Sequence, residues 1–428
     1  MSNLDVAAYL VRNGFVIAGN EIYGGRSGYY DYGHLGVLLK KKIQRLWERY
    51  FVDRKPNSYY LDATIFTSGD VWKASGHMEN FNDILVDCKD CKKRYREDHL
   101  PDSGGIKKCP NCGASNWTEA KPFNLIFRAQ EDHYLRPETA QSIFINFKGF
   151  LRSTNAKIPF CICQVGKAFR NEVTISNFIF RTKEFEQMEC EWFIHPNDAM
   201  DVFTQCQKEM EIFLVNILGI KREMIKVVEI PKEDRAHYSS RSSDVEFEFP
   251  HGWGELWGLA YRSDFDLLSH QNASGKDHQY LDPFTNEKYV PHVVEHSIGL
   301  NRLLYAVVSS AYEVEQLENG ESRELLRISK DLAPYLFSIL PLTKNEKDLA
   351  QDLFLELIEN GISSSLLDKG SIGKRYRKND LIGTPYCITL DQETSRDNFS
   401  FTVRDRDSML QKRISLEEFR NSGYKVTF

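Results

Sequence analysis

The stretch at residues 166–193, GKAFRNEVTISNFIFRTKEFEQMECEWF, constrains the fold of this chain more than any other. Two short runs with apolar and polar residues are separated by a polar loop, which predicts an antiparallel hairpin with one buried face. Strand interiors are normally poor in charge, yet several of the charged side chains in this stretch stand where a plain sheet would place Thr or Val: Arg170, Glu172, Arg181, Glu186 and Glu189. For any single one, a solvated outer face is the alternative. Two arginines on opposite arms, with Phe185 between them, indicate a nucleotide site built on a sheet.

The composition is that of an ordinary globular protein. A chain of 428 residues is expected to form two or three domains, and 41% hydrophobic and 27% charged residues fit that class. No apolar run approaches the roughly eighteen residues that span a bilayer. The N-terminus lacks the basic and apolar regions of a secretory signal. We therefore expect a cytoplasmic protein with no membrane partner.

The net charge of −6 argues against non-specific coating of nucleic acid, because proteins that coat it carry a basic domain. A specific RNA partner is still allowed, since affinity depends on the phosphates that are actually contacted. One local cluster of positive charge lies near the C-terminal end, at Lys369, Lys374, Arg375, Arg377 and Lys378.

Four cysteines form two CxxC pairs, Cys88 with Cys91 and Cys109 with Cys112. Two pairs at this spacing predict a tetrahedral zinc site with four thiolate ligands. Disulfides are the alternative, but they are uncommon in the cytoplasm. Because protein ligands fill all four positions, the Zn²⁺ is expected to be structural and not catalytic. The remaining cysteines show no such spacing, and most are expected to be buried.

Motifs along the whole chain resemble one family. FRNE, a variable loop and FRTKEFEQME resemble motif 2 of the class II aminoacyl-tRNA synthetases, in the form used by glycyl-tRNA synthetases. Further motifs occur along the chain in the family's order: EIYGG, DYGHLG, ASGHMENFND, LRPETAQ, GELWGLAYRSDFDL and PHVVEHSIGLNR. The last of them resembles motif 3. The resemblance implies ATP-dependent attachment of glycine to tRNA(Gly) through glycyl-adenylate, with release of AMP and pyrophosphate.

The fold class expected is α+β. The resemblance implies a catalytic domain at 1–328, with an antiparallel sheet flanked by helices and a zinc-ribbon-like insertion at 86–114. A polar stretch at 313–324 has the composition of a linker. Strands and helices then alternate, which predicts a small, mainly parallel α/β unit, and the resemblance makes residues 329–428 an anticodon-binding domain. Its RNA contacts are expected in the basic cluster and in TVRDRD, at Arg404, Asp405 and Arg406, with a solvated face as the alternative.

Residues 35–51 have strong helical periodicity. The resemblance places this helix in motif 1, which forms the interface of a homodimer. The periodicity alone supports a helix of the chain's own core equally well.

The resemblance assigns ATP binding to residues in three motifs. Arg170 is expected to hold the α-phosphate and Arg302 the γ-phosphate, and these two are the expected catalytic residues. Mg²⁺ is expected to bind the bridging oxygens together with Glu255. Glu172 is expected to accept from the adenine amino group while Phe185 stacks on the ring. The remaining expected ATP contacts are Asn171, Phe180, Arg181, Leu256 and Gly299.

Glycine has no side chain, so its ammonium and carboxylate must supply the affinity. The resemblance assigns this role to Arg96, Glu138, Gln187, Glu189, Arg262, Glu295 and Ser297. The glutamates are expected to bind the ammonium by charge-assisted hydrogen bonds, and Ser297 to crowd the α-carbon so that larger amino acids overlap with it. Pro137 is expected to begin a helix, which offers Glu138 the alternative role of stabilising its start.

Two other functions share these features. A prolyl-, threonyl- or histidyl-tRNA synthetase would have both domains and motifs 2 and 3, but the acidic LRPETAQ and EFEQME segments favour glycine. A non-enzymatic relative would keep the fold as a nucleic-acid-binding subunit. Such a relative is expected to have lost the phosphate-binding arginines, whereas Arg170, Arg181 and Arg302 are all present.

Overall fold

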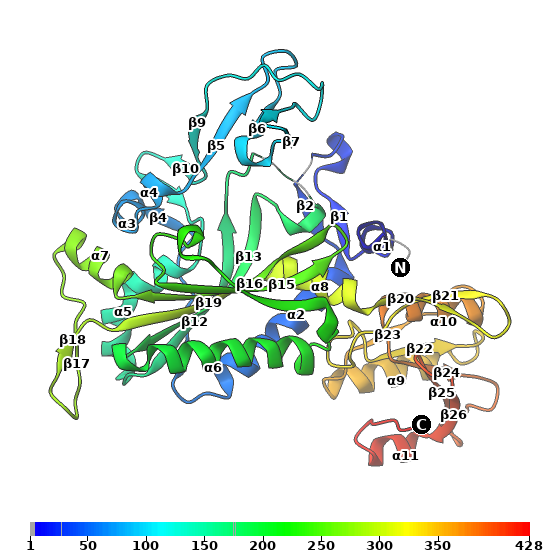
Figure 1. Ribbon diagram of the computed structural model, residues 1–428. Coiled ribbons are helices and arrows are strands. Elements are labelled where there is room, and N and C mark those ends of the chain that lie inside the picture. Colours follow the sequence, from blue (N-terminus) through cyan, green and yellow to red (C-terminus); the bar gives the residue numbers. More distant parts are fainter. Residues whose placement is uncertain (1–4, 27, 174, 176) are drawn as a thin grey trace.

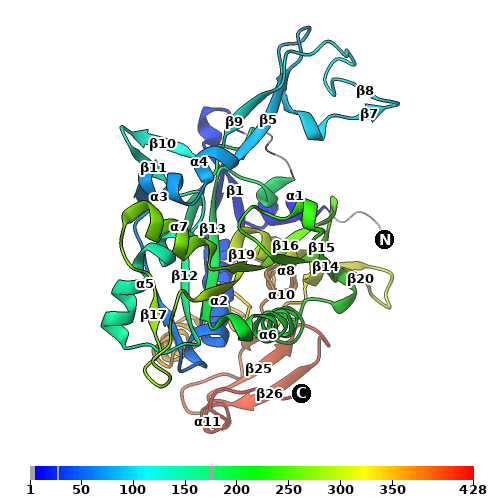
Figure 2. The same cartoon turned by 60° about the vertical axis from the view of Figure 1, so that its left-hand side comes forward.

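The computed structural model describes residues 5–26, 28–173, 175 and 177–428. Figure 1 shows a large twisted sheet at the centre of the molecule, a narrow projection above it, and a second α/β unit, coloured orange to red, at the lower right. In the turned view of Figure 2 the projection stands clear of the sheet, and the C-terminal unit lies at the opposite end. Among the residues that the structure describes, no helix has the length and apolarity needed to cross a membrane.

The central sheet has seven strands. In spatial order they are β14 (Ile225–Glu229), β15 (Arg241–Phe249), β16 (Gly252–Ser263), β19 (His292–Gly299), β13 (Glu184–Ile194), β12 (Phe160–Phe169) and β3 (Ser58–Tyr60). All neighbours are antiparallel except β12 and β3. The antiparallel sheet expected for the catalytic core is therefore confirmed.

The predicted hairpin is formed by β12 and β13, which pair from Phe160 and Phe193 to Phe169 and Glu184. Its charged residues are placed differently from the expectation. Arg170 and Arg181 lie in the connection between the strands, not on the arms. The alternating strand pattern ends where the polar loop begins. The directions of these two side chains are therefore not set by the alternation of the strands.

The main core lies between the sheet and three helices: α2 (His34–Glu48), α6 (Ala199–Ile212) and α8 (Leu300–Ala311). On α2, the apolar side chains of Leu39, Ile43 and Trp47 are fully buried within this single chain. The predicted helix therefore packs into the chain's own core along this face. It continues as a π-helical turn at Arg49–Asp53.

Smaller elements surround the sheet. They are α1 (Val6–Arg12), β1 (Val16–Ala18), β2 (Tyr30–Tyr32), β4 (Phe66–Ser68), α3 (Gly69–Ala74), α4 (His77–Asn80), β10 (Phe127–Gln130), β11 (His133–Leu135), α5 (Ala140–Thr154), α7 (Phe265–Ser274), β17 (Tyr280–Leu281) and β18 (Lys288–Tyr289). The helix expected to begin at Pro137 begins at Ala140. The Pro137 carbonyl accepts a hydrogen bond from Arg170 at 3.0 Å, and Glu138 contacts His77 at 3.1 Å. These tertiary contacts hold the segment outside the helix, so Glu138 does not stabilise its first turn.

The projection contains β5 (Asn82–Asp87), β6 (Arg94–Arg96), β7 (Asp102–Ser103), β8 (Ile106–Lys107) and β9 (Lys121–Asn124). Strands β6, β5 and β9 form a three-stranded sheet. The two CxxC pairs lie beyond the ends of these strands.

The C-terminal unit has a five-stranded sheet in the order β23 (Ser364–Leu366), β22 (Phe337–Pro341), β24 (Tyr386–Leu390), β25 (Ser400–Asp405) and β26 (Gln411–Ser415). Its helices are α9 (Lys347–Glu359), α10 (Ile372–Ile382) and α11 (Leu416–Asn421). The first three strands are parallel and the last two antiparallel, so the sheet is mixed and not mainly parallel. The stretch expected to be a linker forms a hairpin of β20 (Tyr312–Gln316) and β21 (Ser322–Leu326).

Three of the arginines expected to contact RNA are buried in this unit. Arg375, from the basic cluster, donates to the backbone carbonyls of Pro341 and Leu367 at 2.7 and 3.0 Å. Arg404 donates two hydrogen bonds to Asp380, at 2.8 and 3.1 Å. Arg406 donates to the backbone carbonyls of Leu326, Gly383 and Ile328 at 2.9 to 3.0 Å. A buried guanidinium requires such partners, so these three arginines hold the unit together and none is presented to RNA. Lys369, Lys374 and Lys378 of the basic cluster are exposed.

Candidate active site

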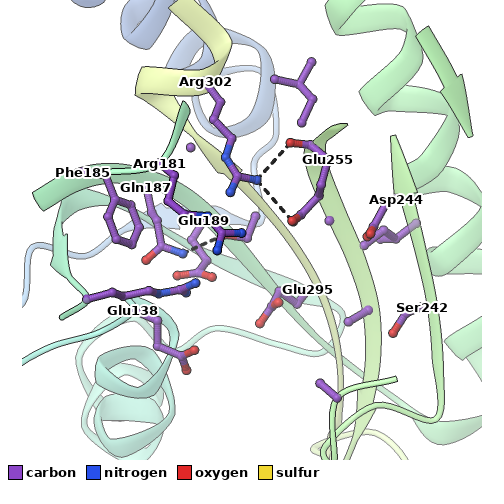
Figure 3. A pocket seen from close by; sticks show the side chains of 18 of the residues that line it. Glu138, Arg181, Phe185, Gln187, Glu189, Ser242, Asp244, Glu255, Glu295 and Arg302 are labelled. Atoms are coloured by element: carbon purple, nitrogen blue, oxygen red, sulfur yellow. Dashed lines mark hydrogen bonds and ion pairs between the residues drawn. The ribbon is translucent and has the colours of Figure 1, made fainter. Parts of the chain in front are cut away.

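A pocket of about 480 Å³ opens beside β13, β16 and β19, the connection between β12 and β13, and the segment before α5. Most of the residues predicted to bind substrates line it: Glu138, Arg170, Glu172, Phe180, Arg181, Phe185, Gln187, Glu189, Glu255, Leu256, Glu295, Ser297, Gly299 and Arg302. Figure 3 shows two ends to the pocket, with Arg302 and Glu255 at one end and Glu138 and Glu295 at the other.

Arg302 occupies the first end. It lies in the first turn of α8, where β19 runs directly into the helix at Gly299. Its Nε donates to the Phe180 carbonyl at 3.1 Å, and its Nη1 donates to the backbone and side-chain oxygens of Glu255 at 3.0 and 3.2 Å. The guanidinium carbon lies 4.2 Å from the centroid of the Phe180 ring. The side chain is thus oriented from two sides while its charge faces the pocket (Figure 3).

The connection between β12 and β13 supplies the side wall. Arg170 is held by the Pro137 carbonyl and lies 5.2 Å from the centroid of the Phe185 ring. Glu172 and Arg181 form an ion pair of 3.6 Å. Glu172 Oε2 is buried and accepts no hydrogen bond within the described residues. This oxygen has Arg181 as a charged neighbour but no hydrogen-bond donor among the described residues. A buried oxygen without a donor is costly, so this position favours a ligand that brings one, such as an amino group on an aromatic base.

A buried acidic cluster forms the second end. Burial, reinforced by the charges of Glu295 and Glu138, raises the pKa of Glu189 to about 8. The Thr139 hydroxyl donates to the same carboxyl group. Burial also acts to raise the pKa of Glu138, but His77 at 3.1 Å and the two arginines Arg262 and Arg170 outweigh it and lower that pKa well below its usual range. Glu138 therefore carries the negative charge at this end of the pocket, and Glu189 can add to it by losing its proton, so this end is suited to a cationic group.

Three of the predicted residues lie outside the pocket lining. Arg262 is buried and donates hydrogen bonds to Asp266 at 2.7 and 2.8 Å and to Glu295 at 2.6 Å. It therefore contacts the acidic cluster on the side away from the pocket. Arg96 on β6 pairs with Asp83 and Asp98. Asn171 accepts a hydrogen bond of 3.1 Å from Lys183 and stabilises the connection.

The structure adds residues that the sequence analysis missed. Tyr238, Ser242 and Asp244 line the pocket from β15 and the turn before it. Burial, then the charges of Glu255 and Glu246, raise the pKa of Asp244 to about 7, while Arg302 lowers it. The alternation of apolar and polar residues in RSSDVEFEF was the available signal of a strand. No motif marks Ser242 or Asp244 as functional.

Asp244 and Glu255 fit a divalent cation. Their carboxyl groups come from the neighbouring antiparallel strands β15 and β16 and both line the pocket. Carboxylate oxygens are the protein ligands that Mg²⁺ prefers. The raised pKa of Asp244, in which the charge of Glu255 takes part, shows a repulsion that a bound cation would relieve.

The four predicted zinc ligands come together in the projection. Cys88 and Cys112 place their sulfurs 3.6 Å apart, as do Cys91 and Cys109, and all four sulfurs lie within 4.8 Å of one another. Zinc–sulfur bonds of about 2.3 Å in a tetrahedron require sulfur separations of about 3.8 Å, whereas a disulfide requires about 2.05 Å. All nine cysteines are free thiols. The arrangement is therefore compatible with zinc.

Comparison with known proteins first defines the class. Residues 123–311 match the tRNA synthetase class II core domain (G, H, P, S and T), and residues 337–422 match the anticodon binding domain. The fold is similar to that of a prolyl-tRNA synthetase from Cryptosporidium parvum, with a TM-score of 0.64 at 12% identity, covering 97% of this chain and 76% of that one. The central sheet and its pocket are thus those of a class II aminoacyl-tRNA synthetase.

Relatives along the full length narrow this assignment. The glycine–tRNA ligase of Mesoplasma florum is 46% identical over 439 residues, which cover 96% of this chain and 97% of that protein. The glycine–tRNA ligase of Clostridium kluyveri is 43% identical over 452 residues, which cover 98% and 97%. The chain belongs to the glycine–tRNA ligase family.

Proposed function

We propose that this protein attaches glycine to tRNA(Gly) in two steps at this pocket. The observation that carries the proposal is the division of one pocket between arginines suited to phosphates and buried glutamates suited to an ammonium group. Full-length similarity to glycine–tRNA ligases supports the choice of amino acid. ATP, glycine and tRNA(Gly) are the substrates.

In the first step the glycine carboxylate attacks the α-phosphate of ATP, and pyrophosphate leaves. The carboxylate is ionised at neutral pH, so the step needs positioning and charge compensation and no general base. Arg170 holds the α-phosphate and Arg302 the γ-phosphate. Phe185 stacks on the adenine while Glu172 accepts a hydrogen bond from its amino group, with further contacts from Phe180, Arg181, Leu256 and Gly299. Asp244 and Glu255 would hold Mg²⁺, which supplies charge neutralisation on the phosphates.

The second step transfers the glycyl group. A terminal hydroxyl oxygen of tRNA forms an ester bond with the glycyl carbonyl carbon, and the anhydride bond between that carbon and the phosphate oxygen breaks. AMP leaves with the electrons of that bond, and the hydroxyl proton passes to the AMP phosphate or to solvent. Residues 329–428 form the anticodon-binding domain in this proposal. The exposed side chains of Lys369, Lys374 and Lys378 are suited to phosphate contacts there.

Selection of glycine follows from the acidic end of the pocket. Glu138, Glu189 and Glu295 bind the ammonium group, and Ser297, which accepts a hydrogen bond of 3.3 Å from Gln187, crowds the α-carbon. Arg262 acts through Glu295, and Arg96 is close enough to Glu172 for their charges to interact. Rejecting a larger side chain requires only steric overlap, so no editing domain is needed.

The direct test is amino-acid-dependent exchange of labelled pyrophosphate into ATP, run with each of the twenty standard amino acids and without tRNA. Exchange with glycine alone would support the first step and its specificity. Exchange with proline, threonine or histidine would overturn the pocket assignment while keeping the fold. Folded protein without exchange for any amino acid would overturn the enzymatic function.

We propose that the four cysteines bind one structural Zn²⁺. Substitution Cys109→Ser is expected to reduce the zinc content from about one ion per chain to near zero and to expose residues 82–124 to proteases, because metal binding is coupled to local folding. Elemental analysis and limited proteolysis measure both effects. Cys387→Ala, in the C-terminal unit, is the control and is expected to retain zinc. Full zinc content in Cys109→Ser would contradict the site.

We propose that the protein is a homodimer. The side chains of Ile22 and Tyr23 are 87% and 85% exposed, which is unusual for neighbouring large apolar residues unless they meet a partner. Light scattering is expected to give about twice the chain mass of 49.7 kDa. Aspartate at both positions is expected to shift the protein toward monomer, whereas Phe284→Asp, at another exposed apolar residue, is not. A monomeric wild type would contradict the proposal.

A further inference from the structure

Glu191 is a buried carboxyl group behind the acidic end of the pocket. It lies on β13 two residues after Glu189, is 0% exposed, and does not line the pocket. In the pairing of β13 with β19 it stands directly opposite Glu295. One carboxyl oxygen from each of Glu189, Glu191 and Glu295 lies within 4.8 Å of the other two. Neither oxygen of Glu191 accepts a hydrogen bond from any described residue.

The charges around Glu191 favour a neutral carboxylic acid at this position. Arg262 on β16 is the neighbouring cation, and its N–H groups are directed to Asp266 of α7 and to Glu295. His77 and Arg170 act on Glu138. The remaining titratable groups around this cluster are acidic or neutral: Glu189, Tyr238, and His270, whose pKa burial lowers to about 4. Burial and then the charges of Glu295 and Glu189 raise the pKa of Glu191 well above its usual range.

We propose that Glu191 is a positioning residue for Glu295: as a neutral acid it donates its O–H to that carboxylate from across the strand pair. Arg262 holds Glu295 Oε2 from the other side at 2.6 Å. An O–H···O⁻ bond is among the stronger hydrogen bonds, so Glu295 would be fixed with its charge available to the substrate ammonium group. This inference rests on the proposed function, in which Glu295 binds glycine.

Two substitutions separate this role from others in the pyrophosphate exchange assay. Glu191→Gln keeps a donor toward Glu295 and is expected to change the KM for glycine by less than about twofold. Glu191→Ala removes the donor and is expected to raise the glycine KM by about tenfold or more, with kcat and the KM for ATP changed by less than about threefold. A general loss of structure would affect all three parameters. Should the alanine variant fail to fold, Glu191→Met replaces it with similar volume and no donor.

The pH profile is the second measurement. As the pH is raised into the alkaline range, the glycine KM of the wild type is expected to rise relative to that of Glu191→Gln, because only the acid can lose its proton. An equal rise in KM for the glutamine and alanine variants would show that Glu191 acts as an ionised charge and would overturn the inference. Unchanged KM in both variants, or matching pH profiles, would also overturn it. An inactive wild type would overturn the proposed function itself, and the inference with it.

Discussion

Substitution Arg302→Ala is expected to lower kcat for glycine-dependent pyrophosphate exchange by about 10²- to 10³-fold. Removing one preorganised charge that compensates the transition state typically costs this much, and arginines on transferred phosphates reach higher values. The structure orients Arg302 through hydrogen bonds to the Phe180 carbonyl and to Glu255. The KM for glycine is expected to change little, because the acidic cluster lies at the other end of the pocket (Figure 3).

Arg302→Lys is the matched variant for this prediction. Lysine keeps the positive charge but loses the planar fork that reaches two acceptors at once. We expect an intermediate activity, measured under the same conditions of saturating glycine. A kcat within about threefold of wild type in Arg302→Ala would show that the γ-phosphate does not depend on this residue, and would contradict its assignment.

Substitution Glu189→Gln is expected to have opposite effects on binding and on stability. Loss of a charge-assisted hydrogen bond to the ammonium group, worth roughly 1.5–3 kcal/mol, should raise the glycine KM by about 10- to 150-fold. The wild-type KM should fall between about pH 6.5 and 8, because Glu189 must lose its proton to bind the ammonium group. That fall should be absent from the glutamine variant, because glutamine does not titrate.

The stability effect follows from the pKa of about 8. A carboxyl group whose folded-state pKa is raised favours the folded state at low pH, and this contribution is lost as the pH rises from about 4.3 toward 8. At about pH 8, the substrate-free Glu189→Gln variant should therefore unfold at a higher temperature than the wild type. The gain is on the order of 1–3 kcal/mol, since each pKa unit corresponds to about 1.4 kcal/mol and neighbouring carboxyl groups share the proton.

Calorimetry at about pH 5 and 8 measures the stability difference, and the exchange assay measures KM. Glu184→Gln is the control, because Glu184 begins the same strand but pairs with Lys167 outside this pocket. It should change neither quantity by much. A glutamine variant at position 189 with wild-type KM would contradict the role of Glu189 in ammonium binding.

Local patterns in the sequence predicted much of the scaffold. The hairpin of β12 and β13, helix α2 and the zinc-type cysteine pairs are all present as expected. Each depends on alternation, helical periodicity or the spacing of a few nearby residues. Such signals lie within one segment and can be recognised without its neighbours.

Features set by contacts between distant segments were predicted less well. Helix α5 begins at Ala140 and not at Pro137, because Arg170 and His77 bind the preceding residues. Arg404 and Arg406 are internal partners of the C-terminal unit, although an arginine pattern alone cannot distinguish a buried ion pair from an RNA contact. The expected linker at 313–324 belongs to a hairpin. Neither of its strands has a long apolar run, so its composition resembled that of a linker.

The sequence by itself therefore determined the class of fold, the family and most of the side chains that line the pocket, since these reside in contiguous motifs. Only the tertiary structure decided which of these side chains face one another. Asp244 joins Glu255, Arg262 lies behind Glu295, and Glu191 shares a buried cluster with Glu189 and Glu295. The ionisation of a carboxyl group depends on its burial and on charges within a few ångströms, and those distances arise only when separate strands are brought together in one sheet.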